Sequence, residues 1–126
     1  MDGAYKDMKE YLAKGAKMPT AFFADNDMIA LGCIKAFQEA GYRVPEDISV
    51  AAFDDLPFCE ISSPRLTTIK VFKYEMGQIA VRRLIEVMKD GGKINTKTQV
   101  CTEFVERDSV IDLNSASKRR RKLEDG

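Results

Sequence analysis

The run from Ile48 to Phe53 is almost continuously apolar and is interrupted only by Ser49. It is far shorter than the roughly 20 apolar residues that a membrane span requires. Short apolar runs of this kind are typical of strands that are covered on both faces in a parallel sheet. The chain is therefore expected to be soluble and to surround this strand with helices.

Strand-like runs alternate with segments of helical periodicity along the rest of the chain. Helices are predicted over 3–14, 28–40, 56–61 and 74–89, and strands over 20–24, 48–53, 66–71 and 98–105. Glycines follow several of the helical segments, where a left-handed residue commonly ends a helix. This order predicts an α/β fold, a three-layer arrangement around a parallel sheet.

Several kinds of chemistry are excluded by the composition. The chain has no histidine, which excludes Ser-His-Asp and Cys-His catalysis and His-ligated metals. Cys33, Cys59 and Cys101 form no CxxC pair, which argues against a disulfide framework and a zinc site and favours a reducing compartment. Neither GxGxxG nor GxxxxGK[ST] occurs. Any chemistry must therefore use carboxylates, amines, hydroxyls or thiols, and we expect no metal and no nucleotide cofactor.

Charge is unevenly distributed, although 20 Lys and Arg balance 20 Asp and Glu. Five basic residues lie together in Lys118–Lys122, so the rest of the chain is acidic. The part of the chain before this basic run has a net negative charge, which does not favour binding to DNA. Residues 114–126 are predicted to be a disordered basic tail.

Polar side chains follow two consecutive predicted strands. Asp25, Asn26 and Asp27 come after the first, and Asp54 and Asp55 after the second. In open α/β sheets ligands bind beyond the carboxyl ends of the strands, so these side chains should share one rim. Carboxylate and amide groups together suit a hydroxyl-rich ligand.

Local roles compete with ligand binding at two of these positions. Asp27 directly precedes a helical run and is predicted to cap it. Asp55 could cap the short helix that follows it or contact the ligand. Asn26 and Asp54 have no equally obvious local duty, so they are the stronger candidates.

A receiver-like phosphoacceptor domain is an alternative, because clustered acids stand beside Thr67, Thr68 and Lys70 on a later strand. The order of elements fits it poorly. A receiver has its acidic pair after the first strand and its acceptor aspartate two strands later, whereas here the clusters follow consecutive strands.

The segment Pro19 to Val71 resembles the effector-binding domain of the lactose-repressor (LacI/GalR) family of bacterial transcription regulators. The resemblance rests on ND-x-x-A-L-G, G-x-R-V-P-x-D-I-S-V, F-D-D and L-T-T-I in the right order and spacing. It implies a periplasmic-binding-protein-like (type I) fold, with two α/β subdomains and an effector cleft between them. Ala52 departs from the glycine usual before F-D-D.

Only part of that domain is expected in this chain, mostly its C-terminal subdomain. The resemblance implies that residues 1–113 form a partial effector-binding and dimerisation domain. Within it, 1–71 would be the C-terminal subdomain portion, 72–104 a crossover helix and strand, and 105–113 a return segment.

Site residues are carried over position by position. Asn26 and Asp54 match effector-binding positions, Asp25 stands where many members have a small residue, and Asp55 completes the candidate set. The dimer interface implied by the resemblance comprises Met28, Leu31, Lys35, Phe58 and Cys59.

The resemblance implies the ligand-sensing part of a cytoplasmic regulator that works as a homodimer, with no cofactor, no catalytic residue and no enzymatic activity. A sugar or small metabolite would alter operator affinity, with DNA contacted only through an N-terminal headpiece that this chain lacks. A periplasmic-type sugar-binding protein is the alternative with the same fold.

Overall fold

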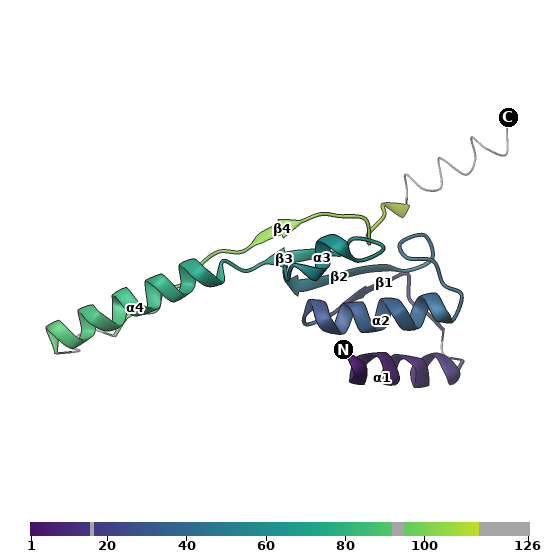
Figure 1. The fold of residues 1–126 in the computed structure, drawn as a ribbon, viewed down its shortest axis with the longest axis horizontal. Helices are drawn as coiled ribbons and strands as arrows, with labels where there is room; N and C mark the ends of the chain where they lie inside the picture. The colour runs from purple at the N-terminus through teal and green to yellow at the C-terminus, as the bar shows by residue number, and fades with distance from the viewer. Residues whose placement is uncertain (16, 92–94, 114–126) are drawn as a thin grey trace, which may run out of the picture.

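The structure, a computed structural model, describes residues 1–15, 17–91 and 95–113. The predicted tail at 114–126 lies outside these residues. Eight helices and strands follow one another in the described part (Figure 1). In chain order they are α1 (Asp2–Ala13), β1 (Ala21–Phe23), α2 (Asp27–Glu39), β2 (Ser49–Asp54), α3 (Phe58–Ile61), β3 (Thr67–Lys70), α4 (Lys73–Asp90) and β4 (Glu103–Val105).

The sheet has the order β1-β2-β3-β4. β1, β2 and β3 are parallel, which confirms the α/β architecture expected from the alternating pattern. β4 differs from the expectation, because it runs antiparallel to β3, with Lys70 opposite Glu103. The reason is topological: the chain leaves the carboxyl end of β3 through α4 and re-enters the sheet from that same end (Figure 1).

The two helices of the N-terminal half stack on the same side of the sheet, with α2 between the sheet and α1 (Figure 1). Phe22 of β1 and Phe37 of α2 are in ring contact, with centroids 5.1 Å apart. Side chains alternate between the faces of a strand, so Phe23 points to the opposite face, where it is 61% exposed. The face of the sheet that α2 covers is thus packed, whereas Phe23 is exposed on the opposite face.

Close approach of α1 to α2 depends on Gly32. A Cβ atom at this position would lie 2.8 Å from the backbone oxygen of Met1 and 3.2 Å from the backbone nitrogen of Tyr5. Only a residue without a side chain lets the two backbones pack this closely. Gly32 is therefore one residue that sets how closely α1 lies to α2.

The core lies between α2 and the sheet. Phe37, Ile48, Val50 and Leu66 are almost completely buried there. Ile48 and Val50 belong to the apolar run that predicted a buried strand in a parallel sheet, and the structure confirms this strand as β2. β2 indeed has a neighbouring strand on each side.

Residues that follow β4 are bound tightly to the body. The buried Ser109 hydroxyl donates to the carbonyl oxygen of Val50 at 2.6 Å and accepts from the amide of Thr67 at 2.8 Å. The amide of Ile111 donates to the Ser49 hydroxyl at 3.2 Å. This segment therefore links β2 to β3 through side-chain as well as backbone hydrogen bonds.

Helix α4 extends away from the body (Figure 1). Its apolar side chains stay largely exposed, with Val81 at 58% and Leu84 at 59%. Gly91 ends the helix in the left-handed conformation, as the sequence predicts. No helix in the described part of the chain is long and apolar enough to cross a membrane.

Candidate functional site

The predicted rim exists, because β1 and β2 are parallel neighbours and end on the same edge of the sheet. Asp25 follows β1 and is exposed, and Asp54 is the last residue of β2. The Asp54 side chain is 35% exposed. Both carboxylates are accessible on this edge, so the two loops that the sequence singles out lie together.

Asn26, and not Asp27, caps α2. Asn26 has an extended backbone, with φ −154° and ψ 166°, and its Oδ1 accepts a hydrogen bond from the amide of Ile29 at 3.0 Å. The prediction that Asp27 is the cap and that Asn26 has no local duty is therefore wrong. The cap uses Oδ1 of Asn26, and the effector contact predicted for this residue stays a prediction.

Asp27 is fully buried and binds groups that are distant in the sequence. One carboxylate oxygen accepts from the Thr68 hydroxyl at 2.5 Å and the other from the amide of Leu56 at 2.7 Å. As the first residue of α2, Asp27 also lies where the helix dipole stabilises a negative charge. Its carboxylate ties α2 to β3 and to the loop that follows β2.

Asp54 and Asp55 reverse the chain at the end of β2. Both have positive φ, 115° at Asp54 and 54° at Asp55. Such conformations cost of order 1–3 kcal/mol at non-glycine residues and persist only where surrounding contacts hold them. This conformation therefore needs stabilising contacts, and the structure contains one at each of the two aspartates.

Lys73, the first residue of α4, holds Asp54. Its ammonium group donates to the Asp54 carbonyl oxygen at 3.0 Å and lies 3.5 Å from Oδ1 of the same residue. The pair is partly exposed, so the ionic component is weak. Its position matters more, because it joins the rim to the point at which the chain departs into α4.

Arg107 holds Asp55. The guanidinium Nη2 lies 2.8 Å from Asp55 Oδ1, and Nη1 donates to the carbonyl oxygen of Leu66 at 2.9 Å. Asp55 does not cap the short helix, because the N-cap of α3 is Pro57 and has no side-chain cap bond. The predicted capping role is thus wrong, and the predicted ligand contact of Asp55 is untested.

Neither Lys73 nor Arg107 was found by sequence reasoning. Both are single basic residues in segments without a ligand-binding pattern. The sequence offers only an indirect indication of such residues. Two adjacent aspartates at the end of a buried strand need cationic partners when their carboxylates are partly buried.

The predicted interface residues differ in accessibility. Met28 and Leu31 are half-buried, whereas Lys35 and Phe58 are exposed. Cys59 is 0% exposed within the chain and offers no surface to a partner, so its place in the predicted interface is corrected. Burial, together with a hydrogen bond to Asp27, raises the pKa of the Cys59 thiol to about 12.

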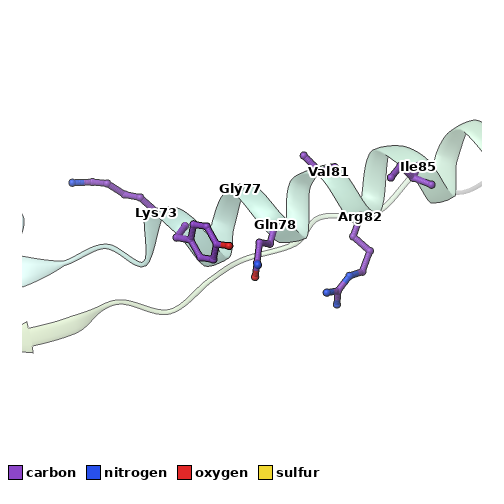
Figure 2. Close-up of a pocket in the computed structure, with 7 residues that line it drawn as sticks. Lys73, Gly77, Gln78, Val81, Arg82 and Ile85 are labelled. Atoms are coloured by element: carbon purple, nitrogen blue, oxygen red, sulfur yellow. The ribbon is translucent and has the colours of Figure 1, made fainter.

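A shallow apolar hollow lies along α4 and begins at Lys73 (Figure 2). Its other lining residues, among them Tyr74, Val81 and Ile85, all come from this one helix. The hollow is thus a stripe on an uncovered helix, continuous at one end with the Lys73–Asp54 contact. Among the residues that the structure describes, no group of three or more potential ligands could hold a metal ion.

Comparisons with known proteins agree on one type of relative. Residues 1–110 match the family described as "Periplasmic binding protein-like domain". The chain is 38% identical over 113 residues to the HTH-type transcriptional repressor PurR of Photobacterium profundum, covering 90% of this chain and 34% of that protein. The chain spans about a third of the length of the curated relatives it matches.

Solved structures give the same result. The lac repressor dimer bound to operator and the anti-inducer ONPF has a TM-score of 0.79 and 32% identity, over 86% of this chain and 37% of that chain. A LacI family transcriptional regulator from Enterococcus faecium with bound ribose has a TM-score of 0.75 and 31% identity, over 86% and 39%.

Proposed function

Because this chain belongs to the periplasmic binding protein-like domain family, we propose that it is the ligand-sensing part of a longer LacI-type transcriptional regulator. The observation that carries the proposal is the match of residues 1–110, together with relatives that are transcriptional repressors. In this proposal the chain binds a small molecule, and DNA is contacted by a separate headpiece. The regulator acts in the cytoplasm, where its DNA is, as a homodimer.

The effector site is proposed at the rim formed by Asp25, Asn26, Asp54 and Asp55. A carboxylate such as Asp54 can accept hydrogen bonds from two hydroxyls, which suits a sugar. The Enterococcus faecium relative with bound ribose supports this ligand class. Asp54 is also bonded to the first residue of α4, so an effector there would contact the junction between the body and α4.

This junction supports a mechanism of coupling. We propose that 1–71 and 105–113 belong to one lobe of the longer protein and that α4 lies in a second lobe. An effector that contacts both stabilises one arrangement of the lobes over the other. Binding energy at the rim would then shift the population of DNA-binding states, which is the thermodynamic requirement for allosteric control.

Calorimetric titration of the full-length protein tests the site. D-ribose is the first probe, followed by other pentoses, hexoses, disaccharides and small nitrogen heterocycles. In Asp54→Asn the side chain keeps its shape and loses its charge, and asparagine tolerates positive φ. Loss of charge-assisted hydrogen bonds of about 1.5–3 kcal/mol predicts a Kd that is roughly 10-fold to 100-fold weaker.

Glu10→Gln is the control, because Glu10 is exposed on α1 and the substitution removes the same charge. We expect its affinity to match that of the wild-type protein. Equal affinities of Asp54→Asn and Glu10→Gln would show that Asp54 does not contact the effector.

A periplasmic-type sugar-binding protein is the second candidate, because it shares the fold. The sequence encoded upstream separates the two. A DNA-binding headpiece supports a regulator, and a secretory leader supports the alternative.

A further inference from the structure

The reversal at Asp54 and Asp55 is held from a distant part of the chain. The two residues have φ of 115° and 54°, so the Asp54 carboxylate points where it does only while this backbone conformation is maintained. A free loop would relax to negative φ, since the positive region is sterically unfavourable for residues with a Cβ atom. The orientation of Asp54 therefore depends on whatever holds its neighbour.

Arg107 provides that restraint in a site shielded from water. The Arg107 and Asp55 side chains are 10% and 15% exposed, and their charged atoms lie 2.8 Å apart. Glu60 Oε1 lies 3.6 Å from the same guanidinium nitrogen. Ion pairs that exclude water are less screened than surface pairs, so added salt should weaken this contact less than it weakens the Lys73–Asp54 contact.

The guanidinium is itself fixed in place. Its Nη1 donates to the carbonyl oxygen of Leu66, directly before β3, and the Arg107 amide donates to the Thr67 hydroxyl at 2.9 Å. Arg107 is thus attached at both its backbone and its head group to the start of β3. It transmits the rigid position of the sheet to the loop that follows β2.

We infer that Arg107 is a positioning residue that holds the Asp54 carboxylate in its effector-binding orientation through the ion pair with Asp55. The inference rests on the proposed role of Asp54. Arg107 is not itself a ligand contact, because its guanidinium is directed to Asp55, Glu60 and Leu66. Removing the Arg107 guanidinium should therefore weaken effector binding only by breaking the ion pair that holds Asp55.

The test compares Arg107→Met with Arg65→Met in the full-length protein. Arg65 is a matched control, because its guanidinium also binds a carboxylate, with Nε 2.6 Å from Asp108 Oδ2, but its partner does not belong to the rim. Arg107→Lys is the conservative variant, because its single ammonium group can pair with Asp55 but cannot reproduce the fork in which Nη2 contacts Asp55 and Nη1 donates to Leu66. Far-UV circular dichroism establishes that each variant is folded.

The first readout is the amide resonance of Asp54 in protein labelled with ¹⁵N-aspartate. We expect it to move in Arg107→Met, to move less in Arg107→Lys and to stay in place in Arg65→Met. The second readout is the calorimetric Kd for D-ribose or, if ribose does not bind, for the panel sugar that the wild-type protein binds.

We expect about 10-fold weaker binding in Arg107→Met, by analogy with residues that support ligands of metal sites. Arg107→Lys should restore part of the affinity, and Arg65→Met should stay within about twofold of the wild type. Arg107→Met should cause no additional loss in an Asp55→Asn background, because both changes break the same pair. An effect of Arg107 that is independent of Asp55 would give an additive loss. A residue that merely stabilised the fold would leave the Kd of the folded protein unchanged.

Two results would overturn the inference, and they are distinguishable. If Asp54→Asn weakens binding while a folded Arg107→Met protein does not, Arg107 does not position the site, and the proposed function stands. If neither substitution changes the Kd although the Asp54 resonance moves, the effector role of Asp54 is wrong, and the inference fails with it.

Discussion

Replacing Asp27 with alanine should destabilise the protein more than any other single change at the rim. The side chain is fully buried and accepts from Thr68 Oγ1 at 2.5 Å and from the Leu56 amide at 2.7 Å. Hydrogen bonds to charged acceptors contribute about 1.5–3 kcal/mol each, and donors left unsatisfied in the core add to the loss. Removing the buried charge offsets part of this, so we expect a net cost of about 3 kcal/mol.

The assay is urea unfolding followed by circular dichroism, with the free energy taken from the midpoint and the m-value. Asp27→Asn keeps one acceptor and should lose about half as much. Thr68→Val removes one donor and should lose about 1–2 kcal/mol. The double variant Asp27→Ala with Thr68→Val should be less destabilised than the sum of the single changes, since the orphaned hydroxyl is gone.

Small effects would refute this reasoning. If Asp27→Ala lies within about 1 kcal/mol of the wild type, the carboxylate is not a structural link, and water must satisfy its partners. Strict additivity of Asp27→Ala and Thr68→Val would show that the two side chains do not interact.

Two further predictions concern helix packing and thiol chemistry. Gly32→Ala should destabilise the protein by about 1 kcal/mol, because overpacking against the α1 backbone outweighs the gain in helix propensity. Gly3 has open space around it, so Gly3→Ala should cause no such loss, and thermal unfolding of the two variants checks this. A thiol reagent at pH 8 should label the exposed Cys101 and leave Cys59 unmodified until the protein unfolds, because a pKa raised to about 12 keeps the Cys59 thiol protonated. Mass spectrometry of the labelled peptides checks this, and labelling of Cys59 before Cys101 would contradict it.

Local pattern was sufficient to predict most of the architecture. The apolar run around Val50, the glycine stops and the helical periodicities correspond to the observed elements, and the resemblance to the lactose-repressor family is confirmed by the comparisons. These features are encoded within a few residues of one another. They are therefore visible without a three-dimensional structure.

Structural features that depend on contacts between distant parts of the chain could not be predicted from the sequence. Asn26 and Asp27 are both competent helix caps, and the choice between them is made by Thr68 and Leu56, which bind Asp27 in the core. The positive φ values at the end of β2 and the supporting Arg107 likewise depend on a segment some 50 residues away. The direction of β4 depends on the route of the chain through α4 rather than on its own sequence.

The antiparallel pairing of Lys70 with Glu103 has a consequence for how this chain can be altered. The ends of the excursion through α4 lie side by side, as they do in a β-hairpin, so residues 71–102 are an insertion into a hairpin whose strands are already in register. A two-residue turn of the Asn-Gly type could span that gap. The sheet could then exchange this insertion for one of different length while every strand pairing of the body is preserved.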